Sequence, residues 1–377
     1  MISQRSVWAG LAVSAAFLAV FAFLFLPFDD IGDVVRGANF WYVAPSLIFY
    51  FAAVYFRSLR WRYLLHPLIG RPRRALFPVV VVGYMANNIL PIRLGEVVRS
   101  YYIGLREGVN PASAFGTVAV ERVFDVFVLF FLIAVVWVLP VGGLLGRVAD
   151  DLPGGTAALL ALSVLPFIGV TVIIGAIVVL EAATVVSLIG RVLFFLPVRL
   201  RSRILGLATR LVEGLTVVRT PRALGAVLLL SLPIWASEVL MLYVISLGFD
   251  IESAFGGRFE TIAAIGLFMA IANLALVVPS TAGGVGPFNF FGAATLVALG
   301  VGDAEAGAYV LTAHIALLLP VTLLGLLVLV SDHVSLRTLL GRTRLVHVGK
   351  QADGPDAPDA PGTTGGESSP APTRPVT

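Results

Sequence analysis

Two short clusters of charged side chains interrupt apolar stretches of this sequence, and their residue types suit the recognition of a phosphate group. The first cluster consists of Arg93, Glu96 and Arg99, and the second consists of Glu121, Arg122 and Asp125. Glu96 and Arg99 stand three residues apart, and the two acids of the second cluster stand four apart, so each pair shares one face of a helix. Arginine presents a planar fork of donors that matches phosphate oxygens. The clusters therefore predict an anion site, a mutual ion-pair network, or both.

Charge of this kind is costly inside a membrane. An ionised side chain at the centre of a membrane helix costs about 2.5–3.5 kcal/mol on insertion scales and usually marks function. We expect Arg93 and Arg99 to bind phosphate, while the second cluster fits equally well as a set of partners that anchors the first without a ligand. Glu238, Asn273 and His314 also lie within apolar stretches. A lone histidine is more typical of a satisfied interior side chain than of a proton carrier.

Two helix-disrupting stretches, called here the first and second breaks, divide long apolar segments. The first break runs from Asn87 to Pro91 and is followed by Gly95, and the second runs from Pro279 to Pro287. Proline lacks a backbone donor and glycine weakens a helix, so both breaks expose unpaired backbone groups. In the second break, a glycine turn ahead of Pro287 predicts free N–H groups at a helix N-terminus, which is a ready anion site. The turn contains Gly283, Gly284 and Gly286.

Composition predicts a helical membrane protein. Of the 377 residues, 58% are hydrophobic and only 13% are charged, whereas soluble domains carry about 25% charged residues. Apolar runs of around 20 residues recur along the chain and are long enough to cross a bilayer as helices. The absence of cysteine excludes disulfides and thiolate chemistry, and the four scattered histidines lack metal-ligand spacing, so we expect no metal and no cofactor. The excess of basic over acidic residues indicates which loops lie on the cytoplasmic side, and it does not indicate nucleic-acid binding.

Charges in the connecting segments alternate in sign and predict the topology. Residues 57–74 and 182–222 are basic, as is the stretch after the last apolar run, whereas residues 29–39 and 249–260 are acidic. Because cytoplasmic loops are rich in arginine and lysine, both termini are predicted on the cytoplasmic side of a cell membrane. The first apolar run lacks a small-residue cleavage site and is interpreted as a retained span. The predicted full spans are residues 7–28, 38–56, 117–140, 156–180, 223–248 and 305–330.

Two apolar stretches, 75–116 and 261–302, begin and end beside charges of the same side, so each is predicted to enter the membrane and return. Broken backbone at membrane depth is tolerated only inside protein or along a polar cavity. Residues 38–140 and 223–330 therefore each follow the order span, broken hairpin, span, which is the pattern of an inverted repeat in secondary transporters. The alternative makes the second hairpin two ordinary spans, in an all-α bundle of eight or more simple spans.

Several motifs occur in the order found in one membrane family: Arg57-x-x-Arg60-Trp61 with Leu64-Leu65, Asn88-x-x-Pro91-x-Arg93-Leu94-Gly95-Glu96-x-x-Arg99, Glu121-Arg122-x-x-Asp125, and the loop from Pro279 to Gly286. Over residues 5–335 the chain resembles the flippase-like family, which is the transmembrane region of lysylphosphatidylglycerol synthases together with its stand-alone relatives. The resemblance implies a domain that moves a lipid between leaflets, often an aminoacylated phospholipid or a polyprenyl-linked species. The chain departs from the pattern at the loop, which reads Ser280-Thr281-Ala282-Gly283-Gly284, and at Asn289, where many relatives carry glutamate.

The leading hypothesis is a lipid flippase without enzymatic activity. The sequence has no ATP-binding motif, so transport is expected to be passive, coupled to an ion or driven by another chain. The domain prediction is a transmembrane region over residues 1–335 and a cytoplasmic basic segment with a disordered tail over 336–377. The predicted substrate-binding residues are Arg93, Glu96, Arg99, Asn88, Gly283, Gly284, Gly286 and Asn289. The predicted supporting charges are Arg60, Glu121, Arg122, Asp125 and Glu238.

Two other functions stay open. A lipid-phosphate phosphatase or transferase is disfavoured because Ser280 and Thr281 have no histidine or carboxylate nearby in sequence. A scaffold subunit without transport activity would use the buried charges only for structure. The expected partners are a membrane lipid as substrate and lipid-modifying or glycan-synthesis enzymes, with no nucleic acid.

Overall fold

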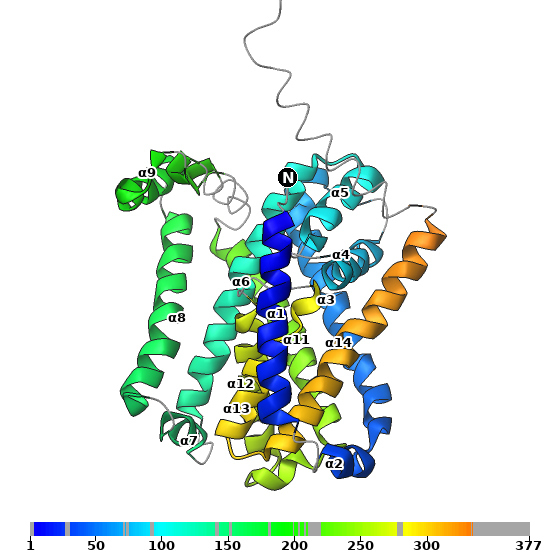
Figure 1. Cartoon of the computed structure of the whole chain (residues 1–377). Helices are drawn as coiled ribbons and strands as arrows, with labels where there is room; N and C mark the ends of the chain where they lie inside the picture. The colour runs from blue at the N-terminus through cyan, green and yellow to red at the C-terminus, as the bar shows by residue number, and fades with distance from the viewer. Residues whose placement is uncertain are drawn as a thin grey trace, which may run out of the picture.

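The computed structural model describes residues 4–26, 31–70, 72, 75–90, 94–139, 143–150, 153–179, 182–198, 200–202, 204–206, 209, 220–276, 282–332 and 334. Within these residues every regular element is helical (Figure 1). The long helices are α1 (Gln4–Phe25), α3 (Val43–Ile69), α6 (Pro111–Val138), α8 (Gly155–Val179), α11 (Pro221–Ser246) and α14 (Asp303–Ser331). The helices of the predicted hairpins are α4 (Phe77–Ile89), α5 (Gly95–Glu107), α12 (Arg258–Ala275) and α13 (Pro287–Ala298). The peripheral helices are α2 (Ile31–Gly37), α7 (Leu144–Asp150) and α9 (Ala182–Val192), with short 3₁₀ turns η1 (Phe40–Tyr42), η3 (Leu193–Phe195), η5 (Ile251–Ala254) and η6 (Ala282–Gly284).

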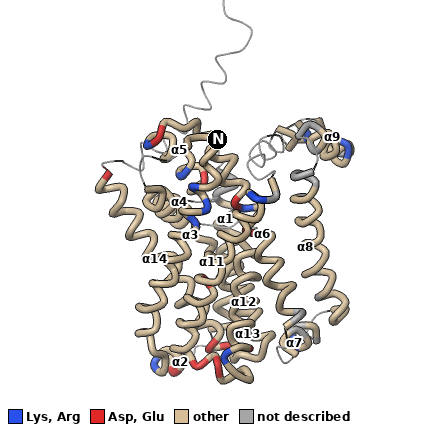
Figure 2. Tube along the Cα trace, turned by 180° about the vertical axis from the view of Figure 1, so that it is seen from behind, with Lys and Arg blue, Asp and Glu red and all other residues tan. Residues whose placement is uncertain are grey.

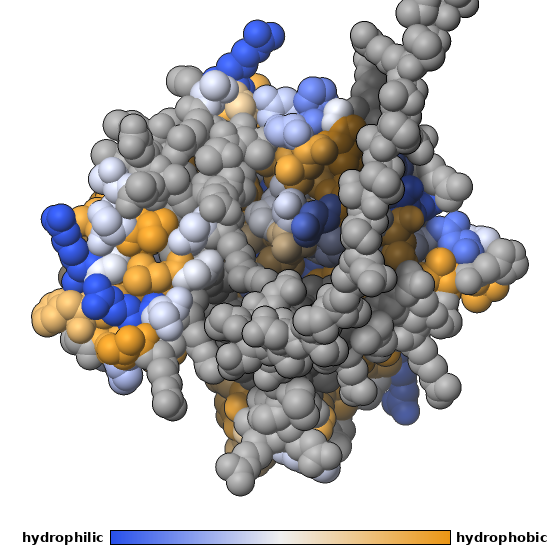
Figure 3. Space-filling view, turned by 90° about the horizontal axis from the view of Figure 1, so that it is seen from above, coloured by the Kyte–Doolittle hydropathy of each residue, from blue (hydrophilic) through white to orange (hydrophobic). Residues whose placement is uncertain are grey.

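The protein spans the membrane several times. By length and composition, five described segments qualify as spans, and they are Phe40–Ile69, Gly155–Val172, Arg222–Ser246, Arg258–Ala275 and Asp303–Ser331. Each of the six predicted spans corresponds to one long helix. Charged residues gather at the two ends of the molecule and leave a largely uncharged band between them (Figure 2). Seen from the end that carries the N-terminus, hydrophilic side chains lie beside apolar ones (Figure 3).

Helix α3 corrects one predicted boundary. The prediction that a basic loop begins at residue 57 is wrong, because α3 continues without interruption to Ile69. Arg57 and Arg60 are buried on this helix, at 5% and 0% exposure. They are therefore interior charges, and a count of loop charges wrongly includes them.

The predicted hairpin helices differ in length. At 1.5 Å per residue, α4 and α5 are each about 20 Å long and α13 about 18 Å, which is too short to cross about 30 Å of hydrocarbon. Helix α12 reaches about 27 Å and is apolar enough to count among the candidate spans. The short helices α4 and α5 lie in the half of the molecule that holds the N-terminus, and α12 and α13 lie toward the opposite end (Figures 1 and 2).

Helix packing brings the two broken segments to the centre of the bundle. Helix α3 packs along α11, α4 along α14, and α12 against α6. Within the hairpins α4 packs on α5 and α12 on α13, while α5 contacts α6 and α13 contacts α14. Helix α8 stands at the side of the molecule and contacts α6, α7 and α9 (Figure 1).

Local sequence signals explain where the long helices begin. The side chain of Asn110 accepts a hydrogen bond from Ala112 N, and Pro111 is the first residue of α6. Thr220 caps α11 in the same way, and Pro221 follows it. Such caps satisfy a backbone donor that the first turn of a helix leaves free, and proline fits there because it has none.

Candidate functional site

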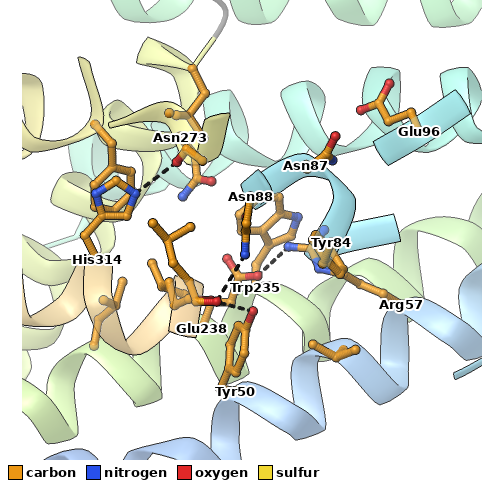
Figure 4. A pocket seen from close by; sticks show the side chains of 18 of the residues that line it. Tyr50, Arg57, Tyr84, Asn87, Asn88, Glu96, Trp235, Glu238, Asn273 and His314 are labelled. Atoms are coloured by element: carbon orange, nitrogen blue, oxygen red, sulfur yellow. Dashed lines mark hydrogen bonds and ion pairs between the residues drawn. The ribbon is translucent and has the colours of Figure 1, made fainter. Parts of the chain in front are cut away.

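Both breaks line one cavity of about 140 Å³ in the interior of the bundle (Figure 4). The first break contributes Asn87 and Asn88, and the second contributes Gly283 and Gly284. The other polar and charged lining residues are Tyr50, Arg57, Tyr84, Glu96, Arg122, Trp235, Glu238, Asn273 and His314. The wall also has an apolar part, formed by Val54, Leu242, Leu276, Phe288, Leu317 and Leu318. The space admits several water molecules or a small polar group.

A continuous cluster of ion pairs borders this cavity, and it is buried except at Arg122 and Glu96, whose side chains are partly exposed. It joins Arg57 and Arg60 of α3, Glu96 and Arg99 of α5, Glu121, Arg122 and Asp125 of α6, and Glu238 of α11. The closest contacts are Arg57 Nη2 to Glu238 Oε1 at 2.5 Å and Arg99 Nη1 to Glu121 Oε2 at 2.7 Å. We call this group the charge cluster. It links the neighbouring helices α5 and α6 to α3 and to α11, which comes much later in the sequence.

Arg99 occupies the closed side of the cluster. Its guanidinium lies 3.7 Å from the centre of the Trp61 ring, and the residue is 5% exposed. Gly83 of α4 faces it, and a Cβ on that glycine would lie 2.9 Å from the Arg99 Cβ. Arg99 does not line the main cavity. The predicted second phosphate ligand, Arg93, lies outside the described residues.

Within the described part of the chain, Arg57 and Arg122 are the two arginines that face the cavity. Arg57 Nη1 lies 3.5 Å from Asp125 Oδ2, and its guanidinium sits 4.9 Å from the Trp235 ring centre. Arg122 bridges Glu96 and Asp125, at 3.4 Å from each. Trp235 is 3% exposed, and its indole N–H finds no hydrogen-bond acceptor in the described part of the chain. Among the described residues, the cavity wall thus carries two arginines, the carboxylates of Glu96 and Glu238, and an indole N–H without an acceptor.

The first break is closed by the side chains of its two asparagines. Asn87 Oδ1 accepts a hydrogen bond of 2.8 Å from Gly95 N, the first residue of α5, and so caps that helix across the break. Asn88 Nδ2 donates to Leu318 O at 3.2 Å and to Thr322 Oγ1 at 3.0 Å on α14. The predicted substrate ligand Asn88 therefore already has partners, in a stretch of α14 that contains a proline. Close packing of α4 on α5 requires Gly95, because a Cβ there would overlap the Gly83 carbonyl.

The second break depends on glycines with positive φ. Gly283, Gly284 and Gly286 have φ of 71°, 73° and 99°, a region that other residues rarely adopt. Gly286 packs against α1, and its N–H donates to Asn289 Oδ1 at 3.3 Å. The amide predicted to meet an anion is thus engaged within the protein. Gly283 lines the cavity, and its carbonyl lies 3.0 Å from His314 Nε2. Residues 279–281 lie outside the described residues.

The sequence analysis did not predict several of the residues that line the cavity as substrate ligands. Arg57 belongs to a recognised motif, and Tyr50, Tyr84, Asn87 and Trp235 have no motif of their own. Trp235 stands three residues before Glu238 and shares its helix face, which is the signal that relates the two. The described residues contain no group of three or more histidine, cysteine or carboxylate side chains that could hold a metal ion.

Comparison with known proteins places this architecture in a family. The family model for the lysylphosphatidylglycerol synthase TM region matches residues 7–325. The chain belongs to that family. The resemblance drawn from the motifs is confirmed over nearly the whole membrane region.

Individual relatives are distant. The chain is 29% identical over 314 residues to glycosyltransferase AglD of Haloferax volcanii, which covers 76% of this chain but 48% of that protein. It is 26% identical over 320 residues to a UPF0104 membrane protein of Methanothermobacter thermautotrophicus, covering 77% and 83%. A UPF0104 membrane protein of Methanocaldococcus jannaschii is 32% identical over 117 residues. The chain thus spans about half the length of the glycosyltransferase. No solved structure matches the chain significantly.

Proposed function

We propose that this protein moves a phosphate-containing lipid, either a phospholipid or a polyprenyl-linked lipid, between the leaflets of the membrane. The observation that carries the proposal is the cavity shared by both breaks, which joins two arginines and an unpaired indole donor in the interior of the bundle. Polar groups inside a membrane are costly, and a cavity that gathers them marks a substrate pathway.

Arg57 and Arg122 are the proposed ligands of the headgroup phosphate. Each guanidinium has five N–H donors, so a pairing with one or two carboxylates leaves donors for another acceptor. The side chain of Arg122 is 37% exposed and is the most accessible arginine of the charge cluster. Trp235 Nε1 offers a third donor on the same cavity wall. In this proposal Arg99 and Arg60 position the wall and do not touch the lipid.

Alternating access is proposed to follow from an inverted repeat. In such a repeat a two-fold axis exchanges α3 with α11, α4 with α12, and α6 with α14. The contact of α4 with α14 then corresponds to the contact of α12 with α6, and both contacts occur. Such repeats move substrates by rocking one half against the other around a central site. The two breaks, one from each repeat, meet at the cavity and supply the moving parts.

The orientation is proposed from charge. Acidic residues occur in the first turns of α2, η5, α12 and α14, whereas the basic ends of α5 and α9 lie at the same end of the molecule as the N-terminus (Figure 2). The arginine-rich end is the cytoplasmic one by the positive-inside rule, which places the N-terminus there. A relative named glycosyltransferase supports the proposal that the partners include enzymes of lipid or glycan synthesis.

Reconstitution tests the proposed function directly. The purified protein is placed in phosphatidylcholine vesicles with tail-labelled fluorescent phosphatidylglycerol, and the label that reaches the outer leaflet is quenched over time. We expect Arg122→Met to slow movement at least about tenfold, since a hydrogen bond to a charged group contributes about 1.5–3 kcal/mol. Trp235→Phe retains the ring but loses the donor, and should slow movement about three- to tenfold.

Arg36→Met is the matched control, because Arg36 forms an exposed pair with Asp33 at the protein surface. Equal rates in wild type, Arg122→Met and Trp235→Phe would refute the site. Release of phosphate from the lipid would favour the phosphatase alternative. Absence of both movement and release with phospholipids and polyprenyl phosphates would favour a scaffold.

A further inference from the structure

The charge cluster is balanced without a substrate. In the described chain it contains four arginines and four carboxylates, so its formal charge is zero. A lipid phosphodiester that enters the cavity therefore adds a negative charge that the cluster does not neutralise. An uncompensated charge in a buried site is strongly unfavourable. The cavity needs a group that gains positive charge when the anion arrives.

His314 is placed to be that group. It lines the cavity from α14, on the opposite side from Arg57 (Figure 4). Its Nδ1 lies 3.0 Å from Asn289 Oδ1, and its Nε2 lies 3.0 Å from the Gly283 carbonyl oxygen. Both partners are oxygen acceptors, whereas a neutral imidazole has only one N–H to donate. The imidazolium alone satisfies both contacts as they stand.

The hydrogen bonds of the Asn289 amide also indicate that the His314 ring is protonated in this arrangement. Asn289 Oδ1 faces both the His314 ring and the N–H of Gly286, while its Nδ2 is buried and has no partner among the described residues. If the amide turned over, Nδ2 would donate to a neutral ring, but the Gly286 N–H would lose its acceptor. The two orientations therefore correspond to two protonation states of His314, and one of them holds the start of α13.

Among the described residues, no carboxylate contacts the His314 ring and competes for this proton. The helices around His314 contribute Tyr84 of α4 to the cavity wall but no other ionisable group from α4, α12, α13 or η6 among the lining residues. The other described ionisable groups that face His314 across the cavity are Tyr50, Arg57, Glu96, Arg122 and Glu238. All the charged members of that set already belong to the balanced cluster, and Tyr50 donates its hydroxyl to Leu317 O at 2.8 Å.

We propose that His314 binds a proton together with the anionic headgroup, so that the transported species is a lipid phosphodiester plus one proton. Burial of the ring opposes its charge, and the arriving phosphate supplies the missing counter-charge. Protonation fixes the Asn289 amide in the orientation that caps α13, which links substrate binding to the geometry of the second break. This inference rests on the proposed function and names its coupling ion.

Binding of a soluble lipid tests the proposal without requiring transport. The probe is dihexanoyl-phosphatidylglycerol, whose phosphodiester stays singly charged near neutral pH, added to the full chain in a neutral detergent. If binding takes up one proton, its Kd rises about tenfold per pH unit between the range in which His314 titrates in the free protein and the higher range in which it titrates in the lipid complex. A weakly buffered indicator should then report about one proton taken up per lipid bound. Dihexanoyl-phosphatidylcholine, which carries its own cation, should bind without proton uptake.

His314→Gln removes the titrating group and keeps an amide near the same partners. We expect the variant to bind phosphatidylglycerol with a Kd that does not change with pH and with no proton uptake. Binding by the wild type with no proton uptake would overturn the proton proposal and leave the proposed function intact. Failure of the wild type to bind or to move either lipid would overturn both. The two wild-type measurements decide the matter even if the variant does not fold.

Discussion

Replacement of Glu121 by alanine separates the structural role of the charge cluster from its proposed binding role. Glu121 is fully buried, and its carboxylate lies 2.7 Å from Arg99 Nη1 and 3.7 Å from Arg60 Nε. After the replacement Arg60 keeps Asp125 at 2.8 Å, whereas among the described residues Arg99 retains the face of Trp61 and no carboxylate. One buried cation is therefore left without its counter-charge, not two.

The expected cost follows from that count. Removal of one partner from a buried ion pair destabilises a protein by about 3–5 kcal/mol, because the remaining charge stays desolvated. We expect Glu121→Ala to lower the free energy of unfolding by about that amount. Arg99→Met in the same chain removes the stranded charge, so the double variant should be less destabilised than the two single changes predict together.

The assay is unfolding by a denaturing detergent, followed by tryptophan fluorescence, on the wild type, both single variants and the double variant. Asp33→Ala is the control, because its pair with Arg36 is exposed and should contribute less than about 0.5 kcal/mol. A coupling energy of at least about 1 kcal/mol is expected between Glu121 and Arg99. Additive effects of the two changes would refute the view that Arg99 is held by Glu121.

Three further outcomes are expected. Gly286→Ala should lower the free energy of unfolding by about 1–3 kcal/mol, because φ is 99° and a Cβ would press on the Ser14 carbonyl of α1; an unchanged melting temperature would contradict this. Asn87→Ala removes the cap on Gly95 and should cost about 1 kcal/mol in the same melting experiment, whereas no loss would show that the cap is dispensable. Asn289→Asp places a carboxylate beside His314 and should hold the proton permanently, so the pH dependence of phosphatidylglycerol binding should disappear; a retained slope would contradict the proton proposal.

The positions of the membrane helices were largely predictable because hydrocarbon allows few alternatives. A chain that crosses it must satisfy its backbone internally over about 20 apolar residues, and composition alone reveals such runs. The same reasoning located both breaks, since proline and glycine mark where a helix cannot continue. It misjudged the end of α3, because a charge count treats every arginine as a surface charge. Arg57 and Arg60 are exceptions that depend on partners supplied by other helices.

For the candidate site, too, some features could be predicted from the sequence and others depended on the tertiary structure. Sequence determined that charge occurs at depth and that Glu121 and Asp125 share a helix face, because both facts depend on spacing within one helix. The pairing of Arg99 with Glu121 fits the predicted meeting of the two clusters. Tertiary structure decided which arginines face the cavity, because that depends on how α5 and α6 turn against α3. It also decided that Asn289 and Gly283, from a different segment, meet both nitrogens of His314. Contacts between helices distant in the sequence are set by packing, and no local pattern encodes them.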